Sequence, residues 1–175
     1  SMAGKIDAML SRGLLNIVGG CCGSTPAHIA EIAKVTEKHC PRPVPADKDE
    51  MTLSGLEPLT VSPERNFLNV GERCNVAGSR KFLRLIKEGS IDEAIGVAGS
   101  QVEAGAQVID VNMDDSMLDA SVELPSFLCR IGSEPEVARV PVMIDSSRWD
   151  VIEASLKCVQ GHPVVNSLSL KEGEA

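Results

Sequence analysis

The sequence predicts an α/β fold in which strands and helices alternate along most of the chain. The first observation is a series of short apolar runs, each followed by a segment of helical periodicity. These expected strands span residues 67–71, 108–112, 140–145 and 163–168. The second observation is that polar residues gather where each run ends. Four strands separated by helices predict a parallel sheet with helical crossovers.

Helices are expected between and after these strands, at residues 81–87, 91–104, 125–131 and 149–159. The polar strand ends are Glu72, Arg73 and Asn75; Asn112, Asp114 and Asp115; Asp145, Ser146 and Ser147; and Asn166 and Ser167. The carboxyl ends of parallel strands form the mouth of a β/α barrel, and they also line the ligand crevice of an open doubly wound sheet. Periodicity alone leaves these two architectures open.

The beginning of the chain predicts a separate strand-loop-helix unit. A helix remnant is expected at 5–11, a buried strand at 14–18 and a longer helix at 26–39. Ser24-Thr25-Pro26 is a helix-start signal, with a hydroxyl cap followed by proline at the first helical position. The next segment is rich in prolines and charges and therefore predicts an extended linker between two domains. The expected organisation is an N-terminal piece at 1–45, a linker at 46–66 and a second domain at 67–175, with another helix beginning near 171–175.

Composition excludes several classes of function. The formal net charge of −8 and the aromatic content of 2% argue against a nucleic-acid or anionic-membrane surface, so small molecules and other proteins are the expected partners. No apolar run approaches the length of about 20 residues that a membrane span needs, and no export signal is evident, so a cytoplasmic location is expected. The six cysteines include the adjacent pair Cys21 and Cys22, a poor disulfide arrangement, which favours reduced thiols or metal ligands.

The stretch Asn16-Ile17-Val18-Gly19-Gly20-Cys21-Cys22-Gly23-Ser24-Thr25-Pro26 resembles the end of the homocysteine S-methyltransferase barrel. This resemblance implies that Cys21 and Cys22 are zinc ligands, joined by a third cysteine expected before residue 1, and that the homocysteine sulfur fills the open position. Zinc would hold the substrate as a thiolate, which is the nucleophilic form. The structural alternative is a pair of buried, reduced thiols at a strand end.

A second stretch begins Gly71-Glu72-Arg73-Cys74-Asn75 and continues through Asp110-Val111-Asn112-Met113-Asp114-Asp115 to Ile144-Asp145-Ser146-Ser147 and Val165-Asn166-Ser167. It resembles the pterin-binding barrel shared by cobalamin-dependent methionine synthases, corrinoid methyltransferases and dihydropteroate synthases. The order of the two motifs is that of the methionine synthases. The resemblance implies pieces of two TIM-type (β/α)8 barrels, namely the last strand-helix unit of one and the first four strand-helix units of the next.

The resemblance also implies which residues bind the pterin. Asp145 and Asn166 match the positions that bind the ring, Glu72 and Asn75 match positions lining the same pocket, and Asp110 and Asn112 are expected to order the surrounding loops. The chemistry agrees, because a carboxylate accepts from the ring N–H and exocyclic amine, while a carboxamide both donates and accepts. A lone aspartate at a strand end has a structural alternative, which is capping or bracing a loop.

The reaction implied by the resemblance moves a methyl group from 5-methyltetrahydrofolate, by way of methylcobalamin, to homocysteine, giving methionine and tetrahydrofolate. Cobalamin is expected on a separate module of the same parent protein, since its Asp-x-His-x-x-Gly pattern is absent from this sequence. The fragment alone is expected to be inactive. Two alternatives stay open: another pterin-binding methyltransferase or synthase, and a non-catalytic fragment that binds a partner through unpaired strand edges.

Overall fold

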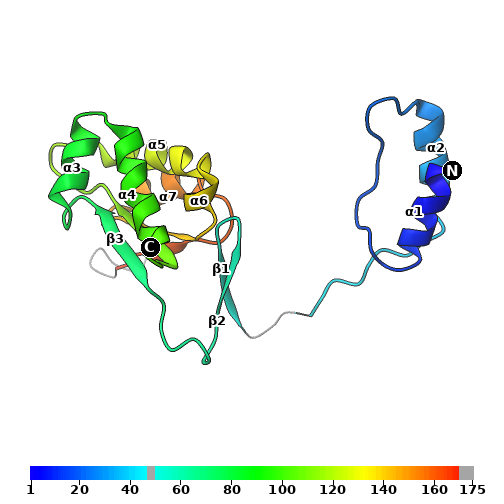
Figure 1. Cartoon of the computed structure of the whole chain (residues 1–175), viewed down its shortest axis with the longest axis horizontal. Coiled ribbons are helices and arrows are strands. Elements are labelled where there is room, and N and C mark those ends of the chain that lie inside the picture. The colour runs from blue at the N-terminus through cyan, green and yellow to red at the C-terminus, as the bar shows by residue number, and fades with distance from the viewer. Residues whose placement is uncertain (47–49, 170–175) are drawn as a thin grey trace. The chain divides into compact units, whose positions relative to one another are not determined.

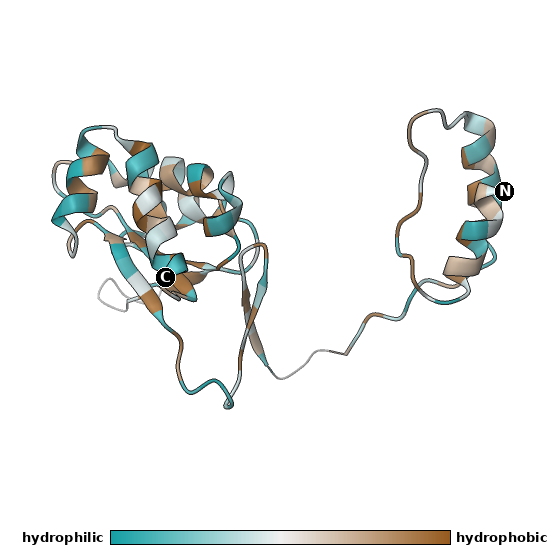
Figure 2. Ribbon diagram, viewed as in Figure 1, coloured by the Kyte–Doolittle hydropathy of each residue, from teal (hydrophilic) through white to brown (hydrophobic). Residues whose placement is uncertain are grey.

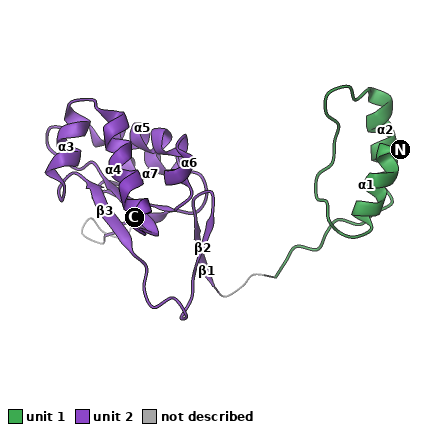
Figure 3. Cartoon of the chain, in the orientation of Figure 1, with its two compact units in different colours: residues 1–48 green, residues 49–175 purple. Residues whose placement is uncertain are grey.

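The computed structural model describes residues 1–46 and 50–169. The chain divides into two compact units, residues 1–48 and 49–175 (Figure 3). The expected helix near 171–175 lies outside the described residues. In the described ranges no helix has both the length and the apolar character needed to cross a membrane.

The first unit is a pair of packed helices, α1 (Met2–Leu10) and α2 (Pro26–Thr36) (Figure 1). Helix α2 begins at the predicted cap, where the Thr25 backbone N–H donates to Nδ1 of His28 at 3.1 Å and the His28 N–H donates back to Thr25 Oγ1 at 3.5 Å. Such reciprocal capping satisfies backbone donors that a helix start otherwise leaves unpaired. Nε2 of His39 lies 2.7 Å from Asp7 Oδ1 and joins the chain after α2 to α1.

The prediction of a buried strand at residues 14–18 is wrong. These residues form no strand, and Ile17 is 92% exposed. A strand is stabilised by the backbone groups and side chains of neighbouring strands, and the described residues of this unit contain no other strand.

The second unit contains a parallel sheet in the order β3 (Val70–Asn75), β4 (Val108–Asn112), β5 (Val142–Asp145) and β6 (Val164–Asn166). The sheet confirms the predicted α/β fold and is consistent with a piece of a TIM-type barrel. The first strand begins and ends later than predicted, so Glu72 and Arg73 lie within the strand.

Among the residues that the structure describes, five helices accompany this sheet: α3 (Arg80–Lys87), α4 (Ile91–Glu103), α5 (Ala120–Gly132), α6 (Pro135–Ala138) and α7 (Trp149–Leu156). These helices carry both hydrophobic and hydrophilic residues (Figure 2). Their buried hydrophobic side chains form one core with alternate residues of the strands, such as Ile109, Val111 and Ile144. Phe82 of α3 and Phe127 of α5 meet edge to face, with ring centroids 5.3 Å apart. Neither α6 nor the first turn of α5 is predicted from the sequence.

Strand β4 shows how the alternation divides the two faces of the sheet. Ile109 and Val111 pack into the helical core, whereas Val108 packs into a second apolar cluster. Because side chains alternate along a strand, Asp110 and Asn112 lie on the face of Val108, called here the inner face.

The predicted extended linker at 46–66 is wrong for residues 51–61, which form a hairpin. Strands β1 (Met51–Ser54) and β2 (Pro58–Val61) pair antiparallel, and Leu53 and Leu59 pack with Val108 at the amino-terminal part of the inner face. Backbone hydrogen bonds of 3.0 Å in both directions link Ser54 to His162. Burial of the two leucines stabilises an element whose prolines and charges suggested a linker.

Candidate functional site

Four polar residues form a row across the carboxyl-terminal part of the sheet. Asn75 pairs with Asn112 in the strand register, Asn112 with Asp145, and Asp145 with Asn166. Residues directly opposite one another on neighbouring strands point to the same face. The structure therefore brings together on the inner face four of the predicted site residues, and Asp110 lies one inner-face position before Asn112 on β4.

Asn75 connects the two carboxylates of this site. Its Nδ2 donates to Oδ2 of Asp110 at 3.0 Å and to Oδ2 of Asp145 at 3.2 Å. Its Oδ1 accepts from the backbone N–H groups of Ala77 and Gly78 at 3.0 and 3.3 Å. Since the carbonyl end of the amide is occupied by the turn after β3, the NH₂ end is held toward the carboxylates.

Asp110 is the most buried carboxylate of the site, with 3% of its surface exposed. Its Oδ2 accepts from Asn75, whereas its buried Oδ1 has no hydrogen-bond partner among the described residues. Burial, together with the nearby charges of Asp145 and Glu72, raises the pKa of Asp110 to about 6. A buried acceptor without a protein donor is uncommon and costly, so Oδ1 is suited to a donor that comes from a ligand.

Asp145 and Glu72 add negative charge around Asp110. Burial raises the pKa of Asp145 above its ordinary value, and the charges of Asp114 and Glu72 act in the same direction. Glu72 itself is exposed, within the irregular part of β3. This concentration of carboxylates favours a ligand that presents N–H donors over an anionic one.

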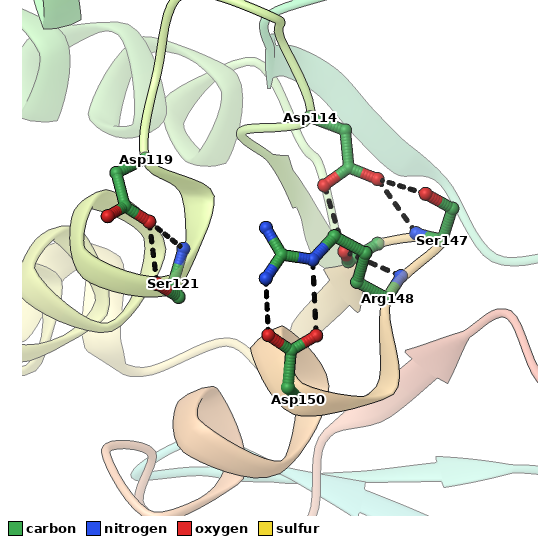
Figure 4. A network of polar contacts seen from close by, with 7 residues as sticks. Asp114, Asp119, Ser121, Ser147, Arg148 and Asp150 are labelled. Atoms are coloured by element: carbon green, nitrogen blue, oxygen red, sulfur yellow. Dashed lines mark hydrogen bonds and ion pairs between the residues drawn. The ribbon is translucent and has the colours of Figure 1, made fainter.

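Asn112 and Asp114 organise the loops around the row. Oδ1 of Asn112 accepts from the backbone N–H of Asp114 at 2.9 Å. Asp114 in turn accepts from Ser146 Oγ at 2.8 Å and from the N–H and Oγ of Ser147 at 2.7 and 2.9 Å (Figure 4). The loop after β4 is thereby joined to the loop after β5. The sequence pattern places Asp114 at a strand end but does not predict this role.

The same view shows how the start of α7 is fixed. The backbone N–H of Arg148 donates to Ser146 Oγ at 3.1 Å, and the Arg148 guanidinium pairs with Asp150 (Figure 4). Asn166 ends strand β6, where its backbone carbonyl accepts from the Ser146 N–H at 2.8 Å. Ser146 therefore contacts both the Asp114 loop and the last strand of the row.

Cys21 and Cys22, the predicted zinc ligands, lie in the first unit. Their Sγ atoms are 3.8 Å apart and both residues are exposed. Two ligands of a tetrahedral zinc with Zn–S bonds of about 2.3 Å are about 3.8 Å apart, so the pair fits half of such a site. The turn is held by Ser24, whose Oγ accepts from the Cys21 N–H at 3.0 Å. Within the described residues no group of three or more His, Cys, Asp or Glu residues is arranged to hold a metal.

Comparison with protein-family models identifies the class. The model described as pterin binding enzyme matches residues 71–175, which is more than half of the chain, and the chain belongs to this family. The model described as homocysteine S-methyltransferase matches residues 1–36. In this order the two matches fit a methionine synthase fragment that spans those two domains, and they support a methyltransferase-type enzyme that acts on folate and homocysteine.

Proposed function

We propose that the second unit binds the pterin ring of 5-methyltetrahydrofolate at the polar row. The observation that carries this proposal is the buried Oδ1 of Asp110, which has no hydrogen-bond partner among the described residues and lies on the same face as the row. The pterin edge carries adjacent N–H and NH₂ donors, and an acceptor pair from Asp110 and Asp145 matches them. Charge-assisted hydrogen bonds are stronger than those between neutral groups, and the ring would supply Asp110 Oδ1 with the donor that none of the described residues provides.

The remaining residues of the row have supporting roles in this proposal. Asn75 holds both carboxylates in place, and Asn166, at the end of β6, donates to and accepts from the ring. Glu72 lines the rim. Asn112, through its hydrogen bond to Asp114, keeps the loops after β4 and β5 open around the ligand.

The enzyme in which this site operates is, in our proposal, a cobalamin-dependent methionine synthase. Cys21 and Cys22 would hold two positions of a zinc ion, and zinc supplies the positive charge that keeps a thiol such as that of homocysteine ionised near neutral pH. The adjacent glycine helps form the turn, because a side chain at Gly20 would meet Ser24 Oγ at 2.5 Å. Methylcobalamin is proposed to be held by another module of the parent protein, and the location is proposed to be the cytoplasm.

The proposal is tested by titrating the chain with 5-methyltetrahydrofolate in a calorimeter. Asp145→Asn should weaken binding by about tenfold or more, because it replaces an acceptor with a donor facing the ring. Asp92→Asn is the matched control: Asp92 is an exposed aspartate whose Oδ1 pairs with Arg130 at 2.7 Å, and its replacement should leave affinity unchanged. Equal affinity of the wild type and Asp145→Asn would overturn the assignment of the site.

The alternative, a non-catalytic interaction fragment, predicts a different oligomeric state and no folate binding. Strands β3 and β6 are the outer strands of the parallel sheet, and unpaired strand edges favour association between chains. A dimer on size exclusion that does not bind folate would favour this alternative, whereas a folate-binding monomer supports the enzyme fragment.

A further inference from the structure

Strand β3 contains one residue more than its neighbour β4. Gly71 pairs with Ile109 and Cys74 pairs with Val111, so Glu72 and Arg73 together lie opposite the single residue Asp110. This is a β-bulge, in which the extra residue leaves the hydrogen-bond ladder and the strand bends.

The bulge decides which face of the sheet Asn75 occupies. Cys74 is fully buried in the core formed with the helices, and Asn75 lies on the inner face with the carboxylates. A shift of one residue in a strand moves every following side chain to the opposite face. If β3 ran on in regular register from Gly71, without the bulge, Cys74 would lie opposite Asn112 and face the carboxylates, and Asn75 would enter the apolar core.

A glutamine of α4 holds this irregular segment. Oε1 of Gln101 accepts from the backbone N–H of Arg73 at 2.7 Å, which satisfies a donor within the bulge. Its Nε2 donates to the Val97 carbonyl at 3.1 Å and to Cys74 Sγ at 3.3 Å. One carboxamide thus ties the helix to the bulged residue and to the residue that follows it.

Gly71 allows the glutamine to approach this closely. A Cβ atom at Gly71 would lie 2.7 Å from Oε1 of Gln101 and 3.2 Å from the Cβ atoms of Gln101 and Ala106. Any side chain at this position therefore displaces the carboxamide from the bulge. The two residues form one arrangement, called here the bulge lock and consisting of Gly71 and Gln101.

We propose that the bulge lock is a positioning element for pterin binding, because it turns Asn75 toward Asp110 and Asp145. The inference rests on the proposed function of the polar row. Gln101 does not touch the ligand in this proposal; it acts through the register of β3 and the direction of the Asn75 amide.

The lock is tested with Gln101→Met, which keeps the length of the side chain and removes its donor and acceptor. The matched control is Gln107→Met, because Oε1 of Gln107 also accepts a backbone N–H, that of Asn69, at 3.2 Å, just before β3 begins. The ligand-independent measurement is the pKa of Asp110, followed by carboxyl-carbon NMR in the whole chain. Donation from Asn75 lowers this pKa, so Gln101→Met should raise it above its value of about 6 and Gln107→Met should not.

Binding of 5-methyltetrahydrofolate gives the second readout. Gln101→Met should lose about tenfold in affinity, as expected for one misplaced charge-assisted hydrogen bond, and Gln107→Met should bind like the wild type. Gly71→Ala, which displaces the same carboxamide from the other side, should reproduce both effects of Gln101→Met. If Gln101→Met does not fold, the Asp110 pKa and the folate affinity of Gly71→Ala test the proposal.

The outcomes separate this proposal from the function on which it rests. An unchanged Asp110 pKa in folded Gln101→Met and Gly71→Ala overturns the lock even if the wild type binds folate. A raised pKa in both variants of a chain that binds no folate supports the effect of the lock on Asn75, but overturns the pterin site and with it the role of the lock in pterin binding.

Discussion

Replacing Asp110 by asparagine should stabilise the protein at neutral pH and abolish its affinity for folate. Burial raises the pKa of this carboxyl from 3.8 to about 6, so ionising it costs more in the folded chain than in the unfolded one. The difference corresponds to about 3 kcal/mol, since each tenfold change in proton affinity is about 1.4 kcal/mol. Asparagine does not ionise, and its carbonyl still accepts from Asn75.

The sign of the pH dependence follows from the direction of the shift. Below pH 3 the carboxyl is protonated in both the folded and the unfolded chain, and it contributes almost no penalty. As the pH rises from 3 through 6 the unfolded chain ionises first, so the wild type loses stability, and above pH 7 the full penalty remains. Asp110→Asn should therefore gain about 3 kcal/mol over the wild type at pH 7.5 and almost nothing at pH 3.

Urea unfolding of the wild type and Asp110→Asn at these two pH values measures the effect. A gain in the free energy of unfolding that appears only at the higher pH, together with lost folate binding, identifies a carboxylate whose place in the fold costs stability. A variant that is equally destabilised at both pH values would refute the reasoning, because it would make Asp110 a structural hydrogen-bond partner.

Three further predictions concern other parts of the chain. Asp114→Ala removes three hydrogen bonds and should cost about 2 kcal/mol, with faster amide exchange in the loop after β5. Gly161→Ala should cost more stability than Gly89→Ala. Both glycines have positive φ, but a Cβ at Gly161 would lie 2.4 Å from a carbonyl oxygen of β1, whereas nothing lies within 4 Å of a Cβ at Gly89. Thermal unfolding compares the two variants, and equal losses of stability would contradict the close packing of the hairpin. Added cadmium should give a thiolate charge-transfer band that disappears when Cys21 and Cys22 are both serine, and a band that persists would place the metal elsewhere.

The sequence predicts the central strands well, because their apolar runs lie between neighbouring strands that pair with them. Val108–Asn112 is a strand with the predicted bounds, buried along its whole length between two neighbours. The apolar run at 14–18 carries a similar signal and forms no strand in a unit where the described residues offer no pairing partner. Local pattern therefore predicts where a strand can form, and neighbouring strands decide whether it does.

The candidate site is predicted in part for a similar reason. Parallel strands align their carboxyl ends, so polar residues at strand ends, such as Asn75 and Asp145, are expected to meet. The importance of Asp110 depends on the burial of one oxygen atom, and that of Gln101 depends on a bulge in a strand distant in sequence. Neither produces a periodic or spaced pattern, so both require the three-dimensional structure.

The most direct test of the pterin site is a crystal structure of this chain with 5-methyltetrahydrofolate bound. The pterin ring should lie over the row, with ring donors within hydrogen-bond distance of Asp110 Oδ1 and of Asp145. A ring bound elsewhere, with Asp110 Oδ1 still lacking a donor from the ligand, would contradict the proposed site.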